Sequence, residues 1–154
     1  MKELLLKLKA CGLAIDWAGD KTIEEIWATC HRCDWMLWLA RKLNIDKRVL
    51  TLAKGHCANT VRHLMKDERS IAAVDMAIKY GEGNATDSEL AAAADAAYDA
   101  TAAYAAAAAY AAAAYDATAD ADARKQSQQE TAEICRKYIP FDLILSGIKS
   151  QEKI

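Results

Sequence analysis

Cysteine and histidine residues offer the first candidate for chemistry, because thiolates and imidazoles are the ligands that Zn²⁺ prefers. Cys30 and Cys33 form a C-x-x-C pair, and His56, Cys57 and His63 follow further along the chain. Helical phase argues against a zinc site, since Cys30 and Cys57 each fall in the apolar stripe of a predicted helix. We interpret both as buried thiols, and expect neither a metal ion nor another cofactor.

A set of basic side chains offers a second chemistry, the binding of a small anion such as a nucleotide. Arg62 and Lys66 are neighbours at i,i+4 spacing on a helix, and Arg69 follows within a turn or a short connection. Guanidinium groups hold phosphate and carboxylate oxygens through paired hydrogen bonds. The residues predicted to bind an anion are Arg48, Arg62, Lys66 and Arg69.

Acidic residues gather in a different segment. Eight acidic residues and no lysine or arginine lie between Glu82 and Asp122, whereas nine basic and four acidic residues lie between His31 and Arg69. Either these charges pair inside the molecule, or one of the faces meets a charged partner. The face predicted to bind a basic protein consists of Asp95, Tyr98, Asp99, Asp116 and Asp120.

Catalytic patterns are missing from the sequence. It contains no glycine-rich phosphate loop, no nucleophile elbow and no H-E-x-x-H pair. Asp95 and Asp99 stand at i,i+4 spacing, which on an alanine-rich helix is typical of a solvated face. We therefore expect a protein that is not an enzyme.

The elements that position these side chains are predicted to be helices throughout. No alternating apolar run appears, and Pro140 is the single proline. Thr22 with Glu25 and Thr86 with Glu89 have capping-box spacing. Asp34 and Asp46 are predicted to cap two more helices. The apolar stripes predicted to face the core are Leu4, Leu8, Cys11 and Ile15; Ile23, Ile26, Trp27 and Cys30; Leu50, Ala53, Cys57, Val61 and Leu64; and Ile71, Val74 and Ile78.

Together these elements predict a single all-α domain over residues 1–154, a bundle of about six helices. Residues 1–83 form a core of short helices, residues 86–139 form a very long or bent alanine-rich helix, and residues 140–154 form a tail or short helix. A straight helix over 86–139 measures roughly 80 Å, whereas a compact domain of this length is roughly 40 Å across. We expect a bend or break near residues 116–122.

The alanine-rich segment presents a narrow stripe of small side chains, which permits close approach of another helix. That neighbour is either part of this chain or a second copy, so a homodimer through the stripe is an alternative. The stripe consists of Ala93, Ala96, Ala100, Ala103, Ala107, Ala111, Ala114, Thr118 and Ala121.

Composition and charge narrow the class of protein and the cellular compartment that we expect for it. A net charge of −2 argues against a protein that coats nucleic acid in bulk. Asp99 and Asp116 make the alanine run a poor membrane span. The first ten residues interleave lysines with leucines, which is typical of an amphipathic helix, and the odd number of five cysteines favours reduced thiols. We expect a cytoplasmic protein without membrane contact.

Three blocks taken together resemble the Imm-five-like immunity proteins of bacteria and phages. The blocks are AIDWAGDKTIEEIWATCHRCDWMLWLARKL, LAKGHCANTVRHLMKDERSIAAVDMAIKYGEGNATDSEL and the alanine run that ends in AEICRKYI, and D-W-M-L-W-L at Asp34–Leu39 is the most specific piece. The resemblance covers about Ala14 to Ile139. It implies an immunity protein for a polymorphic toxin, and brings no catalytic motif.

Three functions remain open at this point. The first is neutralisation of a protein partner, such as a basic toxin, through the acidic face. The second is sequestration of a nucleotide or other small anion by the basic set, as in a phage counter-defence protein. The third is a self-associating structural module held together by the alanine stripe.

Overall fold

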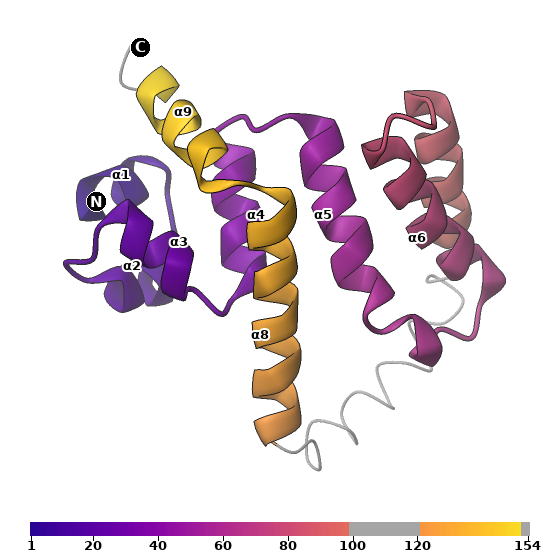
Figure 1. The fold of residues 1–154 in the computed structure, drawn as a ribbon, viewed down its shortest axis with the longest axis horizontal. Helices are drawn as coiled ribbons and strands as arrows, with labels where there is room; N and C mark the ends of the chain where they lie inside the picture. The colour runs from indigo at the N-terminus through magenta and orange to yellow at the C-terminus, as the bar shows by residue number, and fades with distance from the viewer. Residues whose placement is uncertain (99–120, 152–154) are drawn as a thin grey trace.

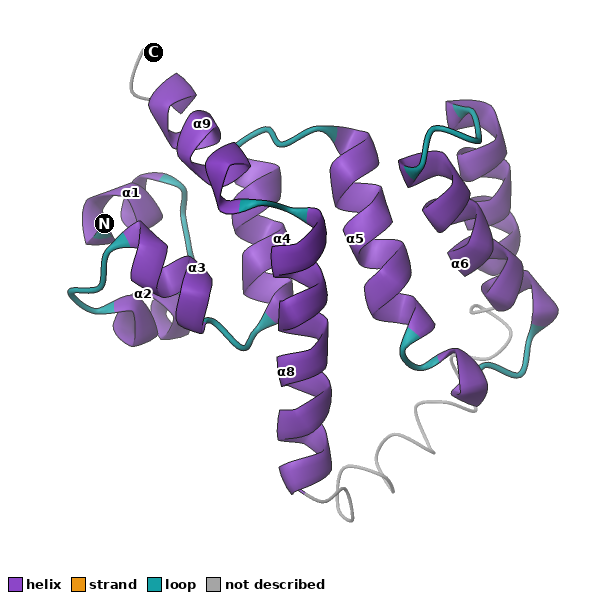
Figure 2. Ribbon diagram, viewed as in Figure 1, coloured by secondary structure: helices purple, strands orange, loops and turns teal. Residues whose placement is uncertain are grey.

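The computed structural model describes residues 1–98 and 121–151, with side chains placed for residues 1–98 and 126–151. Throughout these residues the ordered elements are helices, and no strand is present among them (Figure 2). The helices are α1 (Lys2–Lys7), α2 (Gly12–Ala18), α3 (Ile23–Thr29), α4 (Cys33–Lys42), α5 (Lys47–Asn59), the 3-10 turn η1 (Arg62–Leu64), α6 (Glu68–Gly81), a helical segment over residues 87–98, α8 (Ala121–Tyr138) and α9 (Phe141–Gln151).

The prediction of an all-α protein is confirmed, whereas the number of about six helices is wrong because the described part contains more, shorter elements. The helices of the described residues do not match the predicted very long helix over 86–139 either. Its described portions are residues 87–98, beside α6, and α8, which packs on α4 and α5 (Figure 1). The predicted bend near residues 116–122 lies mostly outside the described residues.

Helices α4, α5 and α8 form the centre of the molecule. α8 packs against both α4 and α5, and α5 packs on its other side against α6 (Figure 1). The short helices α1, α2 and α3 lie beside α4, at the left of Figure 1, and α6 and residues 87–98 lie at the right. α9 crosses the end of α4, where Gly147 comes close to Leu43.

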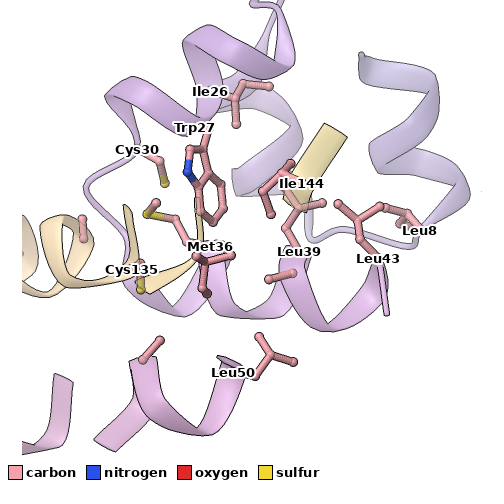
Figure 3. Packing of buried hydrophobic residues seen from close by; sticks show 14 of the residues in the cluster. Leu8, Ile26, Trp27, Cys30, Met36, Leu39, Leu43, Leu50, Cys135 and Ile144 are labelled. Atoms are coloured by element: carbon pink, nitrogen blue, oxygen red, sulfur yellow. The ribbon is translucent and has the colours of Figure 1, made fainter. Parts of the chain in front are cut away.

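The main core fills the space between α3, α4, α8 and α9. Met36, Cys135, Ile139 and Ile144 are its largest completely buried side chains. Figure 3 shows Trp27 lying over Met36, with Cys135 from α8 and Ile144 from α9 in the same cluster. Burying side chains of this size contributes roughly 1.5–3 kcal/mol each relative to exposure. This cluster therefore holds together elements that are far apart in sequence.

The first predicted helix is split into two. Its stripe of Leu4, Leu8, Cys11 and Ile15 assumed one continuous helix, but α1 ends at Lys7 and Lys9 has a φ of 62°. A left-handed residue reverses the direction of the chain, so the helical phase is lost between Leu8 and Cys11. As a result Leu8 is buried and Cys11 is exposed.

The end of α5 provides a second correction. Leu50 and Ala53 are buried as predicted, but the helix stops at Asn59 and a 3-10 turn follows. Val61 and Leu64 consequently leave the stripe and are 38% and 62% exposed. The end of this helix has no glycine or proline signal, which explains why the sequence pattern ran past it.

Two of the predicted caps are reciprocal capping boxes in the structure, Thr22 with Glu25 and Thr86 with Glu89. Asp46 also caps as predicted, since its side chain accepts hydrogen bonds from the amides of Arg48 and Val49. Asp34 does not cap: the N-cap of α4 is Arg32, two residues earlier, and the Asp34 carboxylate binds the Arg32 guanidinium at 2.6 Å.

One arginine joins α8 to the end of α3. The Nη1 of Arg136 donates to the carbonyl oxygens of Trp27 and Cys30, both at 2.9 Å, and its Nη2 binds Glu133 at 2.9 Å. The carbonyls at a helix C-terminus have no partner within the helix and carry the negative end of its dipole. Arg136 therefore satisfies these carbonyls and ties α3 to α8.

We expect Arg136→Met to lower the free energy of unfolding by about 1–3 kcal/mol, because the variant keeps an apolar stem but leaves these carbonyls without donors. Urea denaturation followed by tryptophan fluorescence measures the change. Arg41→Met makes the same substitution at an exposed arginine and should stay within about 0.5 kcal/mol. Equal stability of the two variants would contradict the role given to Arg136.

Candidate functional site

The acidic face begins at a firmly anchored turn. Asp87 accepts a hydrogen bond from the Tyr80 hydroxyl at 3.0 Å and forms an ion pair with Lys47. Lys47 and Tyr80 hold the pKa of Asp87 below its usual range, so this carboxylate is ionised at neutral pH. The helix of residues 87–98 therefore starts from a fixed position beside α5 and α6.

Two of the five predicted face residues lie in the described part of the chain. Asp95 and Tyr98 are three residues apart on the helix of residues 87–98, and therefore share a face. Asp95 is exposed, and Tyr98 is 75% exposed. Asp99, Asp116 and Asp120 lie outside the described residues. The structure thus presents a carboxylate and an aromatic ring side by side at the surface.

The four predicted anion-binding residues are not gathered at one place. Arg48 is in the first turn of α5, whereas Arg62, Lys66 and Arg69 follow the opposite end of that helix. The length of α5 separates the two ends by roughly 18–20 Å at 1.5 Å per residue. Arg48 therefore belongs to a different surface from the other three.

Arg48 is occupied by the backbone of the turn after α6. Its Nη1 donates to the carbonyl oxygens of Tyr80 at 2.6 Å and Ala85 at 3.3 Å, and its guanidinium lies 4.3 Å from the centre of the Tyr80 ring. These contacts fix the turn that leads into residues 87–98. Arg48 thus positions the acidic helix.

The arginines at the other end of α5 are engaged by carboxylates. Arg62 donates from both terminal nitrogens to Asp75, with Nη2 at 2.9 Å from Oδ2, and Arg69 binds Asp67 at 2.9 Å. Each arginine lowers the pKa of its carboxylate partner through these hydrogen bonds, so the pairs are charged at neutral pH. Lys66 is exposed.

The cysteines form a chain of contacts that the sequence did not predict. The thiol of Cys33 on α4 contacts that of Cys57 on α5, which in turn contacts Cys135 on α8. Cys57 also donates to the Thr131 carbonyl at 3.5 Å. Within the described ranges, no three His, Cys, Asp or Glu side chains are arranged as metal ligands.

The alanine stripe is described only at its start, where Ala93 and Ala96 are half-buried, and its other residues lie outside the described side chains. Of the helices in residues 1–98 and 121–151, none is long and apolar enough to cross a membrane. Comparisons with protein-family models, curated proteins and solved structures find no match for this chain.

Proposed function

We propose that this chain is a non-enzymatic protein that binds and neutralises a basic protein partner in a stoichiometric complex. The observation that carries the proposal is the exposed pair Asp95 and Tyr98 on a helix anchored at Asp87. The resemblance to Imm-five-like immunity proteins supports the same class of activity, with a toxin as partner, and the acidic face favours a basic one.

The pair provides two different contributions to binding. The carboxylate, together with the other acids of the segment, attracts a basic surface and speeds association. Tyr98 presents a ring of the kind that is enriched among the residues that dominate binding energy at interfaces. Because Asp95 lies eight residues after the anchored Asp87, it stands roughly 12 Å further along the helix.

The arginine arrangement favours this proposal over anion sequestration by the predicted basic set. Arg48, Arg62 and Arg69 each hydrogen-bond within the chain, so an anion would have to displace a carbonyl or a carboxylate. Such exchange gains little, because one paired interaction replaces another. Among the residues that the structure describes, Asp95 forms no ion pair, so a basic partner would displace none there.

We expect a basic partner protein to co-purify with this chain from its own host, and Asp95→Lys to weaken that complex. The charge reversal replaces attraction with repulsion at the face, so the association rate should fall at least about tenfold at low salt. Surface plasmon resonance at two salt concentrations measures this rate, and Tyr98→Ala should instead raise mainly the dissociation rate.

Glu130→Lys is the matched control, because it reverses one exposed charge on α8, a helix that lies apart from residues 87–98 (Figure 1). The control should keep wild-type association within about twofold. If Asp95→Lys and Glu130→Lys lowered the association rate equally, net charge alone would determine that rate. That outcome would remove the acidic face from the proposal.

A further inference from the structure

A groove that the proposed function does not use runs along the connection between α4 and α5. It has a volume of about 450 Å³, within the usual range of roughly 300–1,000 Å³ for sites that bind small molecules. It lies at the end of α5 that is far from Arg62. Its lining residues are Arg41, Asn44, Ile45, Asp46, Lys47, Leu50, Thr51 and Lys54.

Three cations line this groove. In the part of the chain that the structure describes, neither Arg41 nor Lys54 forms an ion pair, and both side chains are exposed. The third cation, Lys47, shares its charge with Asp87, and its side chain remains 63% exposed. The groove therefore has two basic side chains that no described carboxylate neutralises.

The acidic residue in the lining is already in use. Asp46 accepts hydrogen bonds from the amides of Arg48 and Val49, and so caps α5 with its own carboxylate. An anion in the groove must consequently be held by side chains, because the helix end is occupied. The lining still carries an excess of positive charge, with three cations against Asp46.

The remaining lining residues suit a ligand with more than one kind of surface. Leu50 is buried and Ile45 is half-buried, so they offer an apolar wall. Thr51 adds a hydroxyl group and Asn44 adds an amide. A site with an apolar wall and a few converging polar groups is typical of small-molecule binding.

We propose that this groove binds a phosphorylated small molecule, whose phosphate oxygens are held by Arg41 and Lys54 while its less polar part lies against Ile45 and Leu50. A phosphate fits better than a single carboxylate, because its several charged oxygens can accept from two separate cations at once. Arg41 supplies the paired hydrogen bonds and Lys54 a point charge. The site is independent of Asp95 and Tyr98.

Isothermal titration calorimetry of the full chain with pyrophosphate, ATP and adenosine tests this assignment. We expect saturable binding of pyrophosphate and ATP that weakens as NaCl is raised, and tighter binding of ATP because the ring adds apolar contact. Arg41→Gln combined with Lys54→Gln should lower the affinity for both at least about tenfold, since two charge-assisted contacts are lost.

Lys2→Gln combined with Lys79→Gln is the matched control, because it removes two charges from exposed lysines outside the groove. The control should keep the affinity within about twofold. An equal loss of affinity in both double variants would overturn the site. Binding of adenosine without binding of pyrophosphate would overturn it as well. Absence of saturable heat with pyrophosphate and ATP would overturn it too. None of these results bears on the acidic face.

Discussion

Cys57 should resist alkylation by iodoacetamide in the native protein, while Cys11 reacts readily. Contact with Cys135 and burial raise the pKa of the Cys57 thiol to about 12. The thiolate is the reactive form, and at pH 8 a thiol with this pKa is ionised to only about one part in ten thousand. Cys11 is exposed, so its reaction is not slowed by access.

The alkylation rates expected of the other cysteines depend on the same two properties, thiol pKa and burial. The pKa of Cys33 is also raised, first by its contact with Cys57 and then by burial, and burial raises the pKa of Cys30. Cys135 is completely buried. We therefore expect one fast-reacting thiol and four slow ones, with Cys11 modified at least about a hundredfold faster than Cys57.

Peptide mapping by mass spectrometry after timed alkylation measures each rate. The same reaction in guanidinium chloride is the control, since all five thiols should then react at similar rates. Native labelling of Cys33 or Cys57 as fast as that of Cys11 would contradict the contacts and partial burial of these thiols. A native rate for Cys57 that fails to increase with pH between 7 and 10 would contradict its raised pKa.

The raised thiol pKa also fixes the sign of a stability change with pH. In the unfolded chain a cysteine has a pKa of about 8.5, so the folded state binds the Cys57 proton more tightly. The thiols contribute their full stabilisation below about pH 8.5. That contribution is lost progressively as pH rises toward the folded pKa of about 12.

Local signals in the sequence correctly predicted most of the expected helix caps, which depend on residues close together in the chain. The boxes at Thr22 and Thr86 and the cap at Asp46 each involve residues within three positions, and all three are present. The break at Lys9 was missed because lysine rarely adopts a positive φ, so no residue type marks it. Helix type was therefore predictable, whereas some helix ends were not.

The predicted site residues also divide into those placed by local helical spacing and those placed by tertiary contacts. Asp95 and Tyr98 were placed on one face by helical spacing alone, and the structure keeps both exposed. Arg48 was grouped with Arg62 by charge, but its partners are carbonyls 32 and 37 residues away, in a turn that only the packing of α5 on α6 brings close. Tertiary contacts of this kind leave no periodic signal in the sequence.

Gly81→Val should lower the free energy of unfolding by at least about 3 kcal/mol, and Gly81→Ala by about 1–3 kcal/mol. Gly81 closes α6 against α5. A Cβ atom there would lie 2.7 Å from the Cα and 2.9 Å from the backbone nitrogen of Leu52, too close for any side-chain rotation to relieve. The two helices would have to separate, and Ile78 would lose its close contact with Gly55.

Gly12→Ala is the matched control, because a Cβ at Gly12 meets no atom within 4 Å and the residue is also helical. Alanine has the higher helix propensity, by roughly 1 kcal/mol inside a helix, so this control should be neutral or stabilising. The same gain applies to Gly81→Ala, and the clash must exceed it for stability to fall. Urea midpoints of the three variants decide the matter: a Gly81→Ala protein as stable as Gly12→Ala would mean that α5 and α6 are not packed backbone to backbone at this point.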